Sequence, residues 1–427
     1  MALFAEYQSR PLRTLVTLFV AWKAFLFTVA LSTPNKNGYD TSTSLLFERL
    51  YGSSSPIASA LTTRLTRWDA IYYVHAAKDG YVYEQEWAFG TGVALSIRYL
   101  TQFIQSLGVE AYGIEPLAGI AISNVSHLGS VLALYKLTEV LTKDVKLSFI
   151  SSALSIMSHG GLFLSSPYGE GPCSLLCFLA VLLFALRSQP GRSTLRRCAL
   201  VIASGALLGL ATTIRSNGLS YGLIFAVEAV QTGLAFLQQP TAAGFLHVAA
   251  TVVGGSLAGS GILIPQLAAW SLYCYPDALR PWCNNTLPSI YTFVQDYYWD
   301  VGFLRYWTLN QLPLFIVAAP TLLLLSRSGW DLFLAGAIPT RGAPNQSHKT
   351  LIMTLAAIQM TMAVLALTTY HVQIIARVAS GYPVWYWWIA ASLCVDKTRA
   401  KGQMCIMFMV MYAGIQGALY SSFLPPA

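Results

Sequence analysis

The sequence predicts an all-α polytopic membrane protein, and three observations support this fold class. Of its 427 residues, 55% are hydrophobic and only 10% are charged, whereas about a quarter of the residues in a soluble domain are charged. Apolar runs of about 20 residues, long enough for a helix to cross a bilayer, recur along the whole chain. The basic residues form short clusters between these runs, as expected for loops under the positive-inside rule.

We therefore expect one integral membrane domain over residues 1–427, with about 11 transmembrane helices. In chain order, the expected helices cover residues 12–31, 116–137, 148–166, 171–187, 198–214, 218–238, 245–272, 313–328, 350–370, 383–395 and 403–422. We expect no cleavable signal peptide, because the first run begins near Leu12 and is itself about long enough to span. The runs on either side of Pro167 and Pro172 also fit a second interpretation, a single re-entrant hairpin.

The distribution of lysine and arginine indicates how the helices are oriented. With the N-terminus in the cytoplasm, the loops on that side hold Arg10, Arg13, Lys136, Lys143, Lys146, Arg187, Arg192, Arg196, Arg197, Arg327, Arg341, Lys349, Lys397, Arg399 and Lys401. The short loops on the opposite side hold only Arg215, Arg280, Arg305 and Arg377. This assignment of loops to the two sides holds only if residues 89–107, which include Arg98, do not cross the membrane completely. We therefore expect them at the membrane interface or in a re-entrant position. Residues 32–115 and 273–312 then form the first and second non-cytoplasmic loops.

Composition and motifs exclude several classes of protein. The net charge of +8 does not indicate a nucleic-acid partner, because the basic residues are spread over loops between membrane helices. The chain lacks a Walker motif, a Rossmann glycine fingerprint, a His-Glu-x-x-His motif and an Asp-x-Asp pair. The seven cysteines show no metal-like spacing, and only Cys274 and Cys283 share a loop, where they are compatible with a disulfide. We expect no cofactor, no metal-ligand set and no nucleotide donor.

Two charged residues inside predicted helices leave a second functional class open. Lys23 and Glu228 either act within the bundle or simply face its interior or snorkel to its surface. A lipid flippase or transporter would place its polar groups at mid-span, whereas most acids of this chain lie outside the apolar runs. The sequence also shows no fixed-period repeat and no matching pair of broken helices, which secondary transporters often have. A membrane enzyme is the preferred interpretation.

Residues 67–90 combine charges, aromatic side chains and a turn at the edge of an apolar segment. A short helix-like run in this stretch ends at Gly80, because glycine can adopt the left-handed conformation that closes a helix. The candidate site residues of the stretch are Arg67, Trp68, Asp69, Glu84 and Glu86.

Further candidates come from segments that we expect on the same side of the membrane. The SSPYGE turn (165–170) carries Glu170, and the ends of later helices carry Arg215, Asn217 and Arg377. Carboxylates, guanidinium groups and amides at a membrane boundary suit a lipid-linked sugar phosphate. The lipid tail of such a donor stays in the bilayer while its head group reaches the loops.

Three blocks of the sequence resemble one enzyme family. They are RWDAIYYVHAAKDGYVYEQEWAFG (67–90), YCYPDALRPWCNNTLPSIYTFVQDYYWDVGFLRYW (273–307) and VQIIARVASGYPVWYWW (372–388). In this order they resemble the GPI mannosyltransferase 2 family, the PIG-V class, and the likeness runs nearly from end to end. The resemblance implies a GT-C fold in the endoplasmic-reticulum membrane, with the two long loops and the active site in the lumen.

The resemblance also implies the reaction and its partners. The family transfers the second mannose, in α1,6 linkage, from dolichyl-phosphate mannose to the glycolipid precursor of the GPI anchor. A small accessory membrane subunit is implied for some members. The alternative within the same chemistry is a related lipid-dependent glycosyltransferase with a different acceptor.

The resemblance assigns the catalytic role to Asp69, which matches the essential first-loop aspartate of the family. A carboxylate there would take the proton from the acceptor 6-hydroxyl while an inverting attack displaces dolichyl phosphate, which leaves ionised and needs no general acid. Aspartate is also a preferred helix N-cap residue, so both roles stay open, with catalysis favoured. Arg67, Arg215 and Arg377 are candidates for binding the phosphate. A metal ion is the alternative, although no ligand pattern favours it.

The remaining candidates have weaker assignments. Glu84 and Glu86 either orient sugar hydroxyls or are solvated loop acids, whereas Glu170 on its tight turn is more strongly indicated. Trp68 and Asn217 complete the expected substrate-binding set.

Several other residues have structural expectations. We expect structural roles for His75 and His159. The residues that fit an aromatic belt at the membrane interface better than sugar stacking are Trp299, Tyr306, Trp307, Trp385, Trp387 and Trp388. Three sequons begin at Asn124, Asn284 and Asn345. Only that of Asn284 is expected on the luminal side and outside a membrane helix.

Overall fold

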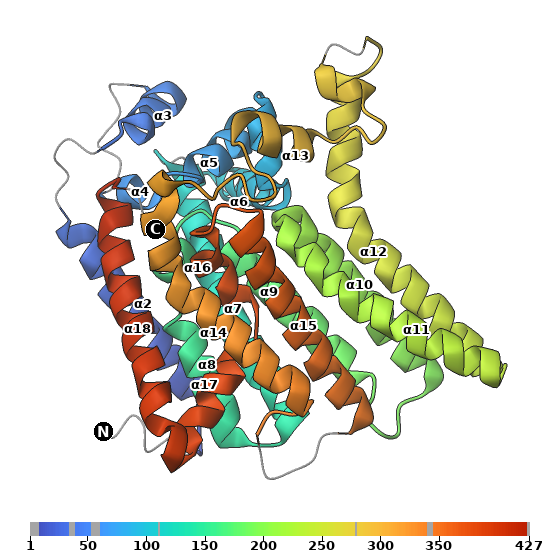
Figure 1. The fold of residues 1–427 in the computed structure, drawn as a ribbon. Helices are drawn as coiled ribbons and strands as arrows, with labels where there is room; N and C mark the ends of the chain where they lie inside the picture. Colours follow the sequence, from blue (N-terminus) through green and yellow to red (C-terminus); the bar gives the residue numbers. More distant parts are fainter. Residues whose placement is uncertain are drawn as a thin grey trace.

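The computed structural model describes residues 8–33, 39–52, 60–109, 112–277, 280–339 and 345–424, and every regular element in these ranges is helical (Figure 1). The longer helices are α2 (Pro11–Ser32), α7 (Ile114–Thr142), α8 (Val145–Ile156), α9 (Glu170–Leu186), α10 (Thr194–Ile214), α11 (Leu223–Gln238), α12 (Ala242–Tyr273), α14 (Leu312–Ala335), α15 (Gln346–Thr368), α17 (Val384–Cys394) and α18 (Asp396–Ser421). The shorter α-helices are α3 (Ser42–Tyr51), α4 (Ala60–Leu65), α5 (Ala70–Asp79), α6 (Gly92–Ser106), α13 (Ile290–Phe293) and α16 (Ile374–Val378). Short segments of other helix types are η1 (Glu84–Phe89), η2 (Gly161–Leu164), η3 (Ser216–Gly222), η4 (Pro281–Asn284), η5 (Val294–Tyr298), η6 (Leu309–Gln311) and η7 (Ala379–Gly381).

The helices confirm an all-α, multi-pass membrane architecture. Within the described residues, eight helical segments are long and apolar enough to cross a membrane. They are α2, α7, α10, η3 with α11, α12, η6 with α14, α15 and α18. The other three predicted runs correspond to α8, α9 and α17, which have 12, 17 and 11 residues and are shorter than the roughly 20 residues of a full crossing. Eleven crossings therefore stay a prediction.

The predicted helix over residues 148–166 is wrong in its second half, because α8 already ends at Ile156. Gly161 follows with φ +50°, and a Cβ placed there would press on the backbone of Ala413. Glycine is the residue that accepts such a conformation without steric cost. The chain then makes the short η2 turn and passes Pro167 before α9 begins. This break, between two helices too short to cross, fits the hairpin interpretation.

Lys23, in the middle of α2, forms hydrogen bonds with the segment between α8 and α9. Its side chain is buried, and Nζ donates hydrogen bonds to the carbonyl oxygen of Leu164 at 2.9 Å and to Oγ of Ser165 at 2.7 Å. Asn124 of α7 donates from the other side to the Ser165 carbonyl oxygen at 3.2 Å. Lys23 therefore faces the bundle interior with polar partners, and it fixes the segment that leads to Glu170.

The short helices α3, α4, α5, α6 and α13 gather at one end of the bundle, and the junction of α17 with α18 lies at the other (Figure 1). Helix α6, which falls within the predicted interfacial segment 89–107, has 15 residues and is not among the candidate spans. Its Arg98 donates hydrogen bonds to the carbonyl oxygens of Ala77 at 2.7 Å and Ala76 at 2.9 Å. These carbonyls belong to the last turn of α5, where a cation is favourable. Arg341, counted above among the cytoplasmic basic residues, lies outside the described residues.

Candidate active site

Asp69 lies at the N-cap position of α5, but its side chain makes no capping hydrogen bond. The preceding residue, Trp68, has φ +53°, which is uncommon for a bulky side chain and persists only where surrounding contacts hold it. The carboxylate of Asp69 instead accepts a hydrogen bond at Oδ2 from Nη1 of Arg377 at 2.7 Å. The side chain therefore connects the first loop to another element rather than capping its own helix.

Arg377 lies between two carboxylates. It belongs to α16, and besides Asp69 it approaches Glu170, with Nε 3.8 Å from Oε1. The guanidinium stacks over the rings of Phe163 and Tyr168, with 4.9 Å and 5.5 Å to the ring centroids. Burial opposes the charge of Arg377, but Asp69 and Glu170 outweigh that effect and raise the pKa of the guanidinium. Arg377 thus stays charged and oriented.

Glu170 and Arg215 form the second half of the cluster. Glu170 is the first residue of α9, and Arg215 directly follows the last residue of α10, so each charge is favoured by its helix dipole. Nη1 of Arg215 donates to Oε1 of Glu170 at 2.8 Å, and Nε donates to Oδ1 of Asn217 at 3.3 Å. Burial is the largest influence and lowers the pKa of Arg215, but Glu170, Tyr73 and Cys173 together outweigh it, so the pKa is raised. Oε2 of Glu170 is buried and has no hydrogen-bond partner among the described residues.

The residues Asp69, Arg377, Glu170 and Arg215 form a continuous row of alternating charges, which we call the acid–arginine row. The side chain of Glu170 is only 1% exposed, whereas that of Asp69 is 29% exposed. Asp69 is therefore the carboxylate of the row that a substrate can reach. The two arginines, Arg377 and Arg215, are 14% and 17% exposed.

Two tyrosines that the sequence analysis did not single out hold the backbone before Asp69. The hydroxyl of Tyr420, near the end of α18, donates to the carbonyl oxygens of Leu65 at 2.9 Å and Arg67 at 3.2 Å. The hydroxyl of Tyr168 also donates to the Arg67 carbonyl oxygen, at 3.2 Å. Tyr168 lies within the SSPYGE turn, which the sequence singles out for Glu170. Tyr420 lies in an ordinary apolar helix, and nothing in its sequence context distinguishes it.

Arg67 and Trp68 lie outside the acid–arginine row. The guanidinium of Arg67 lies over the ring of Phe423, 4.7 Å from its centroid, and no ion pair of Arg67 is present in the described part of the chain. Burial lowers the pKa of Arg67. The indole of Trp68 packs against Phe423 with the ring centroids 5.2 Å apart. Substrate binding by these two residues stays a prediction.

Glu84 and Glu86 are not solvated loop acids, so that interpretation is wrong. Both are buried, at 6% and 1% exposure. Glu84 accepts hydrogen bonds from Arg280, Trp282 and Tyr298 of the second loop. Glu84 thus joins the two long loops.

Glu86 has partners within the first loop instead. Its carboxylate binds His75 and accepts hydrogen bonds from the backbone N–H groups of Val82 at 2.8 Å and Tyr83 at 2.9 Å. Contact of Glu84 or Glu86 with sugar hydroxyls stays a prediction. The contact of His75 with the Glu86 carboxylate agrees with the structural role expected for His75. His159 is buried, and its Nε2 lies 3.2 Å from Oγ1 of Thr321.

The second loop contains the disulfide between Cys274 and Cys283, which confirms that this pair is joined. The interface-belt interpretation is wrong for Trp385 and Trp387, because both are fully buried. Their indole N–H groups donate to the Ala379 carbonyl oxygen at 2.9 Å and to Oγ1 of Thr138 at 2.8 Å. An aromatic-rich run near a membrane boundary does not reveal which rings face inward, and here helix packing decides it.

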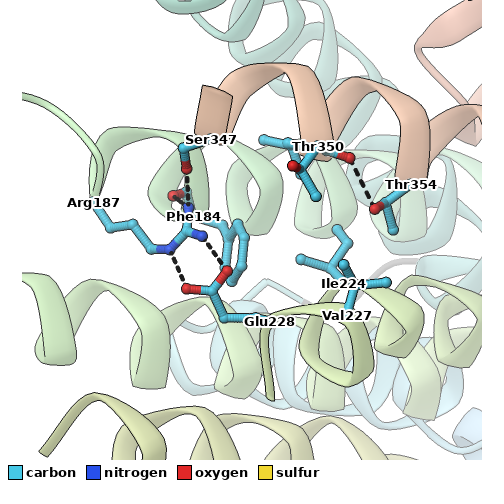
Figure 2. Close-up of a pocket in the computed structure, with 9 residues that line it drawn as sticks. Phe184, Arg187, Ile224, Val227, Glu228, Ser347, Thr350 and Thr354 are labelled. Atoms are coloured by element: carbon cyan, nitrogen blue, oxygen red, sulfur yellow. Dashed lines mark hydrogen bonds and ion pairs between the residues drawn. The ribbon is translucent and has the colours of Figure 1, made fainter. Parts of the chain in front are cut away.

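Glu228, the other charge inside a predicted helix, pairs with Arg187, which directly follows the last residue of α9 (Figure 2). Nε of Arg187 donates to Oε1 of Glu228 at 3.2 Å, and Nη1 donates to Oγ of Ser347 at 3.3 Å. The cavity beside this pair has a volume of about 10 Å³, which is room for no more than one water molecule. Glu228 is thus matched by a cation across two helices, as expected for a charge that faces the bundle interior.

No group of three or more His, Cys, Asp or Glu side chains suited to a metal ion is found in the residues that the structure describes. Within the acid–arginine row, the positive charges are those of Arg377 and Arg215.

Comparison with known proteins identifies the family. Residues 13–427 match the family model described as mannosyltransferase (PIG-V). GPI mannosyltransferase 2 of Gibberella zeae is 47% identical over 429 residues, covering 99% of both chains, and that of Chaetomium globosum is 45% identical over 463 residues, covering 99% of this chain and 98% of the other. Among solved structures, the oligosaccharyltransferase of Archaeoglobus fulgidus matches with a TM-score of 0.47 and 10% identity, over 99% of this chain and 56% of that one. The chain belongs to the PIG-V mannosyltransferase family.

Proposed function

We propose that this protein transfers the second mannose, in α1,6 linkage, from dolichyl-phosphate mannose to the glycolipid precursor of the GPI anchor. The observation that carries the proposal is the acid–arginine row, in which the partly exposed carboxylate of Asp69 lies beside Arg377 at the loop-covered end of the bundle. Family membership supports the sugar that is transferred. We propose a GT-C fold for the chain on the same ground.

In this proposal Asp69 is the general base. It takes the proton of the acceptor 6-hydroxyl while the hydroxyl oxygen attacks the anomeric carbon of mannose. The bond from that carbon to the phosphate oxygen breaks, and a β-linked donor yields an α-linked product. Dolichyl phosphate leaves as an anion, so one carboxylate is sufficient.

Arg377 and Arg215 stabilise the negative charge of the departing phosphate. Their charges are balanced by ion pairs, of Arg377 with Asp69 and of Arg215 with Glu170. A phosphate dianion has more charge and more acceptor oxygens than either carboxylate, so it competes effectively for guanidinium donors. The carboxylate of Glu170 contacts both guanidinium groups and is itself buried. Glu170 therefore holds the two arginines in place.

The proposal places residues 32–115 and 273–312 in the lumen of the endoplasmic reticulum, within one membrane domain of residues 1–427. The positive-inside count supports this orientation. The disulfide of the second loop supports it as well, because disulfides persist in oxidising compartments. A small accessory membrane subunit, implied by the resemblance, belongs to the proposal as a partner and is tested by co-purification.

The test is mannose transfer from dolichyl-phosphate mannose in membranes that carry Asp69→Asn. We expect transfer to fall by roughly 10²- to 10⁴-fold, the contribution typical of a general base. Asp79→Asn is the matched control, since Asp79 belongs to the same loop and pairs with Arg49. Undiminished transfer with Asp69→Asn would contradict the assigned role.

The acceptor is tested separately. Depletion of the protein should cause the GPI precursor bearing one mannose to accumulate. Accumulation of a different lipid-linked acceptor would indicate a related transferase instead. A transporter is disfavoured, because Lys23 and Glu228, the charges inside the helices, are each matched by polar or charged partners.

A further inference from the structure

We infer that Asn284 carries an N-linked glycan, at a position that leaves the active site free. This inference rests on the luminal orientation in the proposed function. The chain has three sequons, beginning at Asn124, Asn284 and Asn345, and the structure gives the three asparagines very different surroundings.

Two of the three side chains already have structural partners. Asn124 lies within the membrane helix α7, where its Nδ2 donates to the carbonyl oxygens of Ile120 at 2.8 Å and Ser165 at 3.2 Å. Asn345 caps α15, where its Oδ1 accepts from the backbone N–H of His348 at 2.8 Å. Glycosyl transfer to Nδ2 of Asn124 would have to break at least one of its two hydrogen bonds, whereas Asn345 is excluded by its place in a cytoplasmic loop of the proposed topology.

Asn284 lies on an open turn. It is the last residue of η4, and the whole sequon from Asn284 to Thr286 is exposed. The next side chain, Leu287, is 85% exposed. A transferase can therefore approach the complete tripeptide.

The length of α12 sets this turn away from the bilayer. Its 32 residues extend about 48 Å at 1.5 Å per residue, whereas the hydrocarbon core is only about 30 Å thick. The end of α12, with the loop that follows it, rises above the neighbouring helix ends in Figure 1. The excess of roughly 18 Å over the hydrocarbon core lets the end of α12 that bears the second loop extend out of the apolar region.

The last turns of α12 pack against the second loop. Oε1 of Gln266 accepts hydrogen bonds from Oγ of Ser289 at 3.0 Å and from the N–H of Tyr291 at 3.2 Å. Above that level, Ala269 packs in a separate hydrophobic cluster, whose buried members are Trp87, Ala269, Cys274, Trp282, Ile290 and Val294. This small core is an extramembrane unit, and the sequon lies on its outer surface.

The disulfide supplies an observation independent of the charge count. Cys283, the residue directly before Asn284, is bonded to Cys274. The same oxidising compartment that maintains this bond is where N-linked glycans are attached to sequons. Disulfide and sequon therefore indicate the same side of the membrane.

The modification is a complete group transfer. Nδ2 of Asn284 forms a bond to the anomeric carbon of an oligosaccharide carried on a polyprenyl diphosphate. The bond from that carbon to the diphosphate oxygen breaks, the polyprenyl diphosphate leaves, and the amide proton passes to a base of the separate transferase that catalyses the step. No oxidant or reductant is needed.

The experiment compares the electrophoretic mobility of the full-length protein before and after treatment with an N-glycan-removing glycosidase. Asn284→Gln and Thr286→Ala should each abolish the mobility shift of one glycan. The matched controls Asn285→Gln and Thr286→Ser preserve the sequon and should retain it. Asn345→Gln and Asn124→Gln should leave the shift unchanged.

The outcomes separate this inference from the proposed function. A shift that is lost only with Asn284→Gln and Thr286→Ala supports the inference. The absence of any shift in the wild-type protein overturns it, while transfer that still depends on Asp69 would leave the proposed function standing. A shift lost with Asn345→Gln would reverse the membrane orientation and overturn both. Mannose transfer by Asn284→Gln membranes should equal that of the wild type, because Asn284 lies outside the acid–arginine row.

Discussion

Arg377 donates a hydrogen bond to Asp69 over 2.7 Å, although 308 residues separate them in the chain. Through this contact the C-terminal part of the bundle orients the carboxylate of the first loop. The same arginine approaches Glu170, so three segments that are distant in sequence meet at one guanidinium.

Arg377→Lys should lower mannose transfer even though it preserves the charge. An ammonium cannot bridge two groups with the fixed geometry of a guanidinium, and loss of one charge-assisted hydrogen bond, worth about 1.5–3 kcal/mol, corresponds to roughly 10- to 100-fold. The rate is measured against the concentration of dolichyl-phosphate mannose, with Arg305→Lys in the exposed second-loop pair as control. Equal losses in both variants would argue against a specific role for Arg377.

Glu170→Ala should destabilise the protein strongly. The side chain is 1% exposed and faces two arginines, and removal of one partner from a buried ion pair costs about 3–5 kcal/mol. Thermal unfolding of the purified protein in detergent measures this loss. Glu139→Ala, which breaks a surface pair with Lys136, should cost no more than about 1 kcal/mol. A melting temperature for Glu170→Ala as high as that of the control would refute the prediction.

Tyr420→Phe should reduce both stability and transfer without changing any charge. The variant removes the hydroxyl that donates a hydrogen bond to the carbonyl oxygen of Leu65. An unsatisfied buried acceptor costs about 1–3 kcal/mol. The backbone before Asp69 also loses the hydrogen bond from Tyr420 to the Arg67 carbonyl oxygen. Tyr99→Phe is the control, because Tyr99 is 65% exposed on α6. Wild-type transfer by Tyr420→Phe would show that Tyr168 alone holds this backbone.

The contact between the two long loops should depend on pH through Glu84. Burial opposes ionisation of Glu84, but hydrogen bonds from Arg280, Trp282 and Tyr298 outweigh it and lower the pKa. A lowered folded-state pKa means that the stabilisation is complete above the ordinary value of about 4.3 and is lost as the pH falls below it. Amide hydrogen exchange of η4 and η5, corrected for the intrinsic pH dependence, should therefore accelerate in acid.

Glu84→Gln provides the matched control for that experiment. Its side chain does not titrate, so the exchange of η4 and η5 should already be fast at neutral pH and should not accelerate further in acid. If acid accelerated amide exchange equally in the wild type and in Glu84→Gln, a group other than Glu84 would be responsible for the pH dependence.

Much of the fold was predictable because membrane helices are recognised by local composition. Each of the 11 predicted runs overlaps an observed helix, but the run over residues 148–166 does so only in its first half. Helix α8 ends early at Ile156, and the chain then turns through Gly160 and Gly161 although the surrounding residues are largely apolar. Helix α12 is longer than its predicted run at both ends.

The site was predicted unevenly. Asp69, Glu170, Arg215 and Arg377 were all named from the sequence, and they form one connected row. Glu84 and Glu86 were grouped with them by proximity in the chain, whereas their partners are Arg280 and His75. Neighbouring positions in a loop do not imply a shared site, because the side chains leave the backbone in different directions.

The sequence by itself determined the membrane class, the helix order and the family, because apolar runs and extended residue blocks are properties of the linear chain. Only the tertiary structure decided which charges meet. Electrostatic and hydrogen-bond partners are fixed by distances of a few ångströms between helices, and such distances depend on packing across the whole bundle. For that reason Tyr420, which has no distinguishing sequence context, contacts the backbone beside the catalytic candidate.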